Sequence, residues 1–131
     1  MDELPIRSGD DVVRIRQHVR NAAATTGLSL VDQTKLVTAA SELARNTLIY
    51  GGGGLVRVEV VKSATGRAGV RLAFVDKGPG IANIDLALKD GWTSGTGLGL
   101  GLSGSRRLVD EFELTSRPGS GTSVVVVKWS R

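Results

Sequence analysis

The 131-residue sequence predicts an α+β fold, a two-layer α/β sandwich in which helices cover one face of a mixed, mainly antiparallel sheet. Three observations support this class. Two long segments near the N-terminus repeat apolar residues at helical spacing. Two pairs of later segments alternate apolar and polar residues and are joined by short turns, a pattern typical of antiparallel hairpins. The order strand, two helices, two strands, glycine-rich region, helix, two strands then indicates helices grouped on one side of the sheet.

The composition indicates one domain spanning residues 1–131, long enough to bury a core without disulfides or metal. The sequence has no cysteine, which excludes a disulfide scaffold and a cysteine-ligated zinc site. The acidic N-terminus has no apolar signal region and no long apolar stretch follows, so we expect a cytoplasmic protein without a membrane span. The net charge of +4 is scattered and aromatic residues are few, which does not favour nucleic-acid binding. An acidic protein or a nucleotide suits this charge equally well.

The first elements are a short strand and a long helix. Leu4–Arg7 is a candidate strand, and Ser8 or Asp10 can cap a helix that runs to about Thr26 and is closed by Gly27. The apolar residues of this helix share one face: Val12, Ile15, Val19, Ala22 and Ala23. Three arginines fall largely elsewhere: Arg14, Arg16 and Arg20. This basic ridge is either a solvated surface or a place where a partner docks.

A second helix is predicted from Ser29 to about Tyr50. Asp32 follows Ser29 by three residues, which is a capping-box signal, and Gly51–Gly54 terminate the helix. Its buried stripe is predicted from residues three and four apart: Leu36, Ala40, Leu43 and Thr47.

A hairpin is predicted next, from strands Leu55–Val61 and Gly69–Asp76 joined by the turn Ser63–Gly66. The inward residues of the first strand are expected to be Val56, Val58 and Val60, and those of the second Val70, Leu72 and Phe74. Residues 77–101 read as loop-rich, with a short helix near Asp85–Leu88.

The C-terminal elements are a helix at 103–110 and a second hairpin. The hairpin pairs Glu113–Arg117 with Thr122–Trp129 through the turn Pro118–Gly121. No internal repeat is visible.

The most informative motif is a run with glycine at every second position, Gly95–Leu102, ahead of the last helix. Glycine backbone can approach a ligand closely, and its N–H groups near a helix N-terminus favour phosphate. A flexible linker is the alternative, but flexible linkers are polar throughout, and the interspersed leucines would be exposed to water in a solvated coil. The run lacks the Gly-Lys-Ser/Thr ending of a Walker loop and the acidic residue that follows a dinucleotide loop at a set distance. The downstream segments of eukaryotic-type protein kinases are absent too, so these three kinds of phosphate loop are excluded.

Two further features accompany the run. Asp76 ends a strand ahead of the glycine turn Gly78–Gly80, and its carboxylate could accept a hydrogen bond from the exocyclic amine of adenine; an ordinary turn explains the same residues. Glu42 and Asn46 share one face of the second helix. They could supply a general base and an oxygen ligand for Mg²⁺, although such a pair is also common on a solvated face.

The chain resembles the GHKL superfamily, whose members share the Bergerat-fold ATP site. The resemblance covers nearly the whole chain and rests on four motifs in this order: E-x-x-x-N on a helix, D-x-G-x-G, the glycine run and Gly121-Thr122. The resemblance implies that Asp76 binds the adenine amine with support from Thr122. It makes Gly78 and Gly80 the turn beneath the nucleotide, Asn46 the Mg²⁺ ligand and Glu42 the general base. It also implies a lid that wraps the triphosphate, formed by Gly95, Thr96, Gly97, Leu98, Gly99, Leu100 and Gly101.

Within that superfamily, residues 41–54 and 85–91 resemble the small RsbT-type serine/threonine kinases of the bacterial stressosome. The resemblance implies ATP-dependent phosphorylation of STAS-domain proteins and, after release, activation of a PP2C-type phosphatase by binding. It implies no nucleic-acid or membrane partner. The sole histidine, His18, lies on the first helix without a dimerisation hairpin, so it reads as a surface or half-buried residue rather than a phosphorylation site.

Two other functions stay open at this point. The chain could act chiefly as a switchable binding module, in which phosphorylation decides which partner holds it. It could instead be an anti-sigma kinase that binds and inhibits a sigma factor, although the Asn-Ala-x-x-His ending typical of that group is lacking here.

Overall fold

The computed structural model describes residues 1–80 and 102–131, which form three helices and five strands. In chain order they are β1 Asp2–Ile6, α1 Gly9–Thr26, α2 Leu30–Ile49, β2 Gly54–Lys62, β3 Ala68–Asp76, α4 Leu102–Leu108, β4 Glu111–Arg117 and β5 Gly121–Trp129. The predicted elements in these ranges are confirmed, with ends displaced by one or two residues. The short helix expected near Asp85–Leu88 lies outside the described residues.

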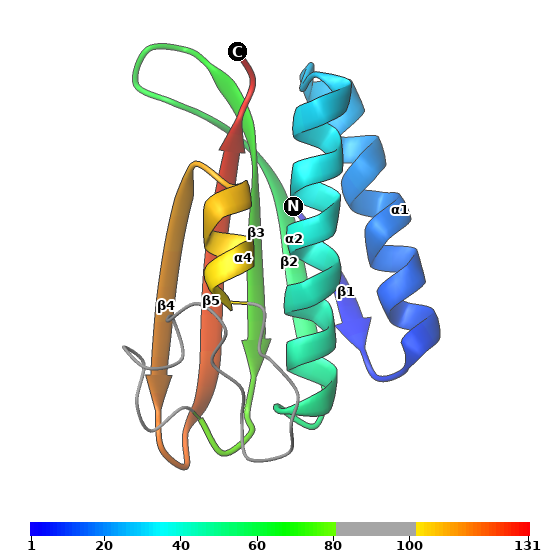
Figure 1. Ribbon diagram of the computed structural model, residues 1–131, viewed down its shortest axis with the longest axis vertical. Helices are drawn as coiled ribbons and strands as arrows, with labels where there is room; N and C mark the ends of the chain where they lie inside the picture. The colour runs from blue at the N-terminus through cyan, green and yellow to red at the C-terminus, as the bar shows by residue number, and fades with distance from the viewer. Residues whose placement is uncertain (81–101) are drawn as a thin grey trace.

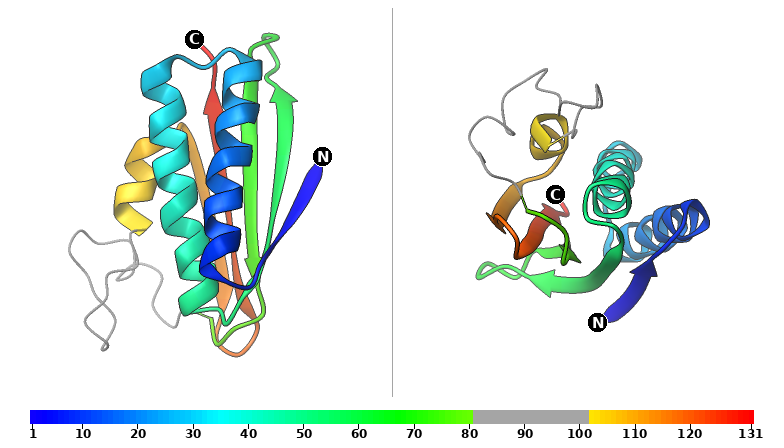
Figure 2. Two further views of the ribbon diagram at one scale, coloured as in Figure 1. Left: turned by 90° about the vertical axis from the view of Figure 1, so that its right-hand side faces the viewer. Right: turned by 90° about the horizontal axis from the view of Figure 1, so that it is seen from below.

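The strands form one sheet in the order β1-β2-β3-β5-β4, and every neighbouring pair is antiparallel. β5 inserts between β3 and β4, so the second hairpin is added to the first with β5 as the inner strand. Figures 1 and 2 show α1, α2 and α4 on the same face of this sheet. The predicted two-layer α+β sandwich is confirmed, and its described ladders are wholly antiparallel.

The core lies between the helices and the sheet face that they cover. The inward stripes predicted for the two long helices are buried, with Ala22 only partly so. From the sheet, Val56, Phe74 and Val124 stand side by side in register and meet those stripes. Val60 was predicted to be inward and buried but is 59% exposed. The ladder between β1 and β2 ends at Val58, so Val60 lies past the edge strand.

The helix ends follow the signals in the sequence. Ser29 caps α2, because its hydroxyl accepts a hydrogen bond from the N–H of Asp32 at 3.1 Å. Gly27 ends α1 in the left-handed conformation with φ of 90°. At the start of α1 the Asp11 carboxylate accepts hydrogen bonds from the backbone N–H of Arg7 and of Ser8. The bond from Arg7 is the main reason that the pKa of Asp11 is lowered.

An ion cluster that the sequence did not predict joins the N-terminal end of α2 to the end of β5. We use the name "ion cluster" for four residues: Asp32, Asp110, Lys128 and Arg131. Lys128 Nζ lies 3.6 Å from Asp32 and 3.4 Å from Asp110, and the Lys128 side chain is only 5% exposed. Burial raises the pKa of Asp110, but the N–H of Trp129 and the charges of Lys128 and Arg131 outweigh burial and lower it overall.

None of the described helices is both long and apolar enough to cross a membrane. His18 is half-buried, with Nε2 at 2.9 Å from the carboxylate of Asp2, so it ties α1 to β1. This position agrees with the predicted structural role of the histidine.

Candidate active site

Asp76 is the last residue of β3, and the sheet places polar neighbours beside it. In the register, Asp76 stands opposite Gly54 of β2 on one side and opposite Thr122 of β5 on the other. The N–H of Gly78 donates a hydrogen bond to Asp76 Oδ1 at 2.8 Å, which fixes the carboxylate in a turn. That bond uses one of roughly four acceptor positions on a carboxylate, so capacity to accept from a ligand is left.

Glycines allow three chain segments to close around Asp76. A methyl group on Gly51 would overlap the Asp76 side chain, and one on Gly121 would overlap the Asp76 carbonyl oxygen. Gly54 is equally restricted, since a methyl group there would overlap the carbonyl oxygen of Val75. The α2–β2 connection, the end of β3 and the start of β5 therefore pack so closely that no side chain fits at these three glycines. Sequence reasoning treated Gly51 and Gly54 only as helix terminators and missed this packing.

The predicted turn Gly78–Gly80 is held against its neighbours in the same way. A methyl group on Gly78 would come within 2.6 Å of the Gly51 Cα, and one on Gly80 would overlap the Arg117 carbonyl. Gly80 also has φ of 77°, a conformation that favours glycine. The N–H of Gly119 donates to the carbonyl of Pro79 at 2.7 Å. This turn and the β4–β5 turn thus form one continuous surface beside Asp76.

Thr122 lies beside Asp76 as the sequence predicted. Its hydroxyl is 2.9 Å from the hydroxyl of Ser116 on β4, and the Ser116 hydroxyl donates to the Gly121 carbonyl at 3.1 Å. Ser116 was not predicted as part of the site. The signal was present in the hairpin register, which sets Ser116 opposite Thr122. The pair of hydroxyls fixes the orientation of the threonine next to the carboxylate.

Glu42 and Asn46 occupy successive turns of α2, on the helix that leads into Gly51. Glu42 is partly exposed and lies 3.4 Å from the guanidinium of Arg45. Asn46 is half-buried, and its backbone carbonyl accepts hydrogen bonds from the N–H groups of Tyr50 and Gly51. These bonds turn the chain at the end of α2 toward Asp76. The structure therefore brings both ends of the predicted site, the α2 pair and Asp76, to the same end of the sandwich (Figure 1).

The predicted triphosphate-binding residues cannot be placed here. Gly95, Thr96, Gly97, Leu98, Gly99, Leu100 and Gly101 all lie outside the described residues. Within the described part of the chain, no group of three or more His, Cys, Asp or Glu side chains could hold a metal ion by itself. The amide oxygen of Asn46 suits Mg²⁺, which prefers oxygen ligands and is usually bound by few protein groups beside phosphates.

Comparison with known proteins supports one family over most of the chain. Residues 31–130 match the model for the histidine kinase-, DNA gyrase B- and HSP90-like ATPases. The serine/threonine-protein kinase RsbT of Bacillus subtilis is 44% identical over 121 residues, covering 92% of this chain and 90% of that protein. An anti-sigma F factor of Clostridium beijerinckii is 37% identical over 98 residues, covering 70% of this chain and 66% of that protein.

A solved structure confirms the fold independently. The crystal structure of the RsbU and RsbW domains of Rv1364c from Mycobacterium tuberculosis superposes with a TM-score of 0.64 and 21% identity. The match covers 100% of this chain and 33% of that longer one. At this identity the likeness concerns the arrangement of helices and strands.

Proposed function

We propose that this chain, which belongs to the histidine kinase-, DNA gyrase B- and HSP90-like ATPase family, is an ATP-dependent serine/threonine protein kinase of a partner-switching module. Its substrates would be STAS-domain proteins in the cytoplasm, and once released it would activate a PP2C-type phosphatase by binding. The observation that carries the proposal is the 44% identity to a serine/threonine-protein kinase over nine-tenths of both chains. The polar residues gathered at one end of α2 and β3 supply a matching site.

In the proposed site Asp76 recognises the adenine. Its carboxylate accepts a hydrogen bond from the exocyclic amine, and Thr122 supports the base from the neighbouring strand. Gly78 and Gly80 form the turn proposed to lie beneath the nucleotide, and they let this turn pack directly on the backbone of Gly51 and Arg117. The residues from Gly95 to Gly101 are proposed to bind the triphosphate through backbone N–H groups.

Glu42 is the proposed general base. Its carboxylate takes the proton of the substrate hydroxyl as that oxygen forms a bond to the γ-phosphorus, while the bond to the β,γ-bridging oxygen breaks and ADP leaves. Arg45 lies beside Glu42 and orients its carboxylate. Asn46, one helical turn on, is the proposed protein ligand of Mg²⁺. The ion, when bound with ATP, neutralises charge on the phosphates.

The test is transfer of labelled phosphate from Mg-ATP to a purified STAS-domain protein. We expect incorporation with the wild type and a loss of about 10²–10⁴-fold with Glu42→Gln, because the proton acceptor is removed. Binding of ATP should change little in this variant, since Glu42 does not contact the adenine site. Equal rates for Glu42→Gln and wild type would remove Glu42 from the mechanism, and no transfer by the wild type would refute the kinase.

A second function, inhibition of a sigma factor, is favoured by the 37% identity to an anti-sigma F factor. The two functions differ in their stable complex. An anti-sigma kinase retains a sigma factor in a pull-down, whereas the kinase proposed first retains a STAS-domain protein. A separate experiment tests whether the chain signals by binding: if an ATP-site variant without kinase activity still activates the phosphatase, activation depends on binding and not on phosphate transfer.

A further inference from the structure

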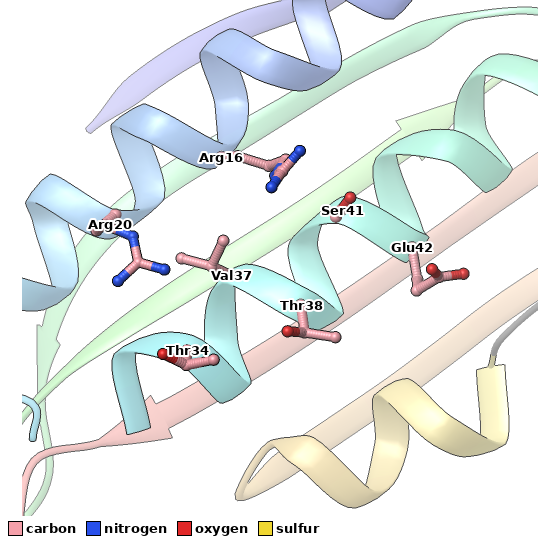
Figure 3. A pocket seen from close by; sticks show the side chains of 7 residues that line it. All are labelled: Arg16, Arg20, Thr34, Val37, Thr38, Ser41 and Glu42. Atoms are coloured by element: carbon pink, nitrogen blue, oxygen red, sulfur yellow. The ribbon is translucent and has the colours of Figure 1, made fainter. Parts of the chain in front are cut away.

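A pocket of about 240 Å³ lies between α1 and α2, and it extends to the proposed catalytic base. We call it the interhelical groove. Figure 3 shows the side chains that line it, namely Arg16 and Arg20 from α1 and Thr34, Val37, Thr38, Ser41 and Glu42 from α2. Among the described residues of the proposed nucleotide site, Glu42 alone lines this groove.

The two arginines of the groove are exposed, and within residues 1–80 and 102–131 neither has an ion pair or a side-chain hydrogen bond. Arg14 on the same helix differs, because its guanidinium is 2.8 Å from the Asp11 carboxylate. A guanidinium that forms no ion pair can bind an incoming carboxylate through two parallel hydrogen bonds. Arg16 and Arg20 are therefore available to an acidic partner, whereas Arg14 is already paired.

The dimensions of the groove suit a short extended segment. From Thr34 to Glu42 the α2 wall rises by about 12 Å, since each helical residue adds roughly 1.5 Å. An extended chain covers that distance with about four residues at roughly 3.3 Å each. Figure 3 shows Arg20 on the side of Thr34 and Val37, and Arg16 on the side of Ser41. A segment with its hydroxyl at Glu42 would thus carry later side chains past both arginines.

The lining favours a protein segment over other anions. Val37, only 7% exposed, provides an apolar floor, and the hydroxyls of Thr34, Thr38 and Ser41 can bond to a peptide backbone. Among the described residues, no aromatic side chain lines the groove for base stacking, which disfavours a single-stranded nucleic acid. Separate carboxylates on a peptide fit two separate guanidinium groups.

We propose that the interhelical groove binds an acidic segment of the protein substrate, with Arg16 and Arg20 pairing with carboxylates about two to four residues from the acceptor serine or threonine. The proposal rests on the proposed kinase function for the identity of that partner. It assigns the basic ridge of α1 to recognition of the substrate, and it makes the ridge continuous with the base that deprotonates the acceptor.

The experiment compares two fluorescent peptides by anisotropy with the full chain. Both carry one serine, followed two and four residues later by glutamates in one peptide and by lysines in the other. We expect the wild type to bind the glutamate peptide at least about tenfold more tightly, and Arg20→Glu to reverse this preference. Arg67→Glu is the matched control, because it makes the same charge change at an exposed residue of the β2–β3 turn, away from the groove.

The outcomes separate this proposal from the kinase function. If Arg20→Glu and Arg67→Glu show the same preference between the glutamate and lysine peptides, the groove does not recognise acidic side chains and the proposal is overturned. It is overturned too if Arg20→Glu weakens binding of Mg-ATP tenfold, because the arginine would then belong to the nucleotide site. Failure of phosphate transfer by the wild type would count against the kinase alone, since peptide binding is measured without catalysis.

Discussion

The two ends of α2 hold polar groups in opposite ways. At its N-terminal end Asp32 belongs to the ion cluster, where two carboxylates and two cations neutralise one another and the lysine is buried. At its C-terminal end the chain turns into Gly51, whose backbone lies against the carboxylate of Asp76. At the N-terminal end, the charged side chains pair with one another. At the C-terminal end, the Asp76 carboxylate is packed against glycine and can still accept hydrogen bonds from a ligand. The first arrangement stabilises the fold, and the second suits a ligand.

The largest change in the free energy of unfolding is expected when a substitution breaks the ion cluster. Lys128→Met keeps the volume of the buried stem but removes the buried cation of the ion cluster, which leaves Arg131 as the cluster's one cation beside Asp32 and Asp110. Removing one partner of a buried pair costs about 3–5 kcal/mol, so the free energy of unfolding in urea should fall by that amount. The affinity for Mg-ATP should stay unchanged.

Lys62→Met is the control for this variant, because Lys62 is exposed at the end of β2. Equal unfolding free energies for the two variants would contradict a stabilising role of the ion cluster. A large loss of ATP affinity in a folded Lys128→Met protein would show that the two ends of α2 are not separate.

A smaller effect is expected at the opposite end, from Gly51→Ala. The added methyl group would overlap both the Cβ and the carboxylate of Asp76, so Asp76 must shift away from its place at the end of β3. The affinity for Mg-ATP, measured by titration calorimetry, should fall by about tenfold, equivalent to ~1.4 kcal/mol. Gly9→Ala is the matched control, since a methyl group there meets nothing within 4 Å. Equal affinities would show that the glycine contact is not needed for binding.

The smallest effect concerns pH and Asp110. Its pKa in the folded chain is below the ordinary value of 3.8, so its ionised form stabilises the fold above that pH, and this contribution is lost as the pH falls through the folded pKa. Asp110→Asn should therefore cost about 1 kcal/mol of unfolding free energy at pH 7. The difference from wild type should close as the pH falls from the ordinary value of 3.8 through the lower pKa of the folded chain. A difference that stays constant over this range would contradict the assignment.

Local patterns predicted most of the fold. The helical stripe of α2, its cap at Ser29 and the alternation in β3 depend on neighbours within a few residues, and all three are confirmed. Val60 shows the limit of this reasoning. Alternation placed it inward, but whether an inward residue is covered depends on where a distant edge strand stops.

The sequence motifs named candidate site residues, whereas the contacts that pack around them were not predicted. Asp76 and Thr122 were singled out by motif, and the register sets them side by side. The ion cluster could not be foreseen, because Asp32 and Lys128 are brought together only by the complete fold. Ser116 and the contact of Gly51 with Asp76 were missed for the same reason. The assignment of the site residues to ATP remains a proposal.

The most direct test of the central claim makes the same substitution at both ends of α2. Mg-ATP is titrated into the wild type, Asp76→Asn and Asp110→Asn, each shown to be folded by circular dichroism. If Asp76 recognises adenine, its variant binds ATP at least about tenfold more weakly, because a charge-assisted hydrogen bond is lost, while Asp110→Asn binds like wild type. Equal affinity of Asp76→Asn and wild type would contradict the proposed nucleotide site.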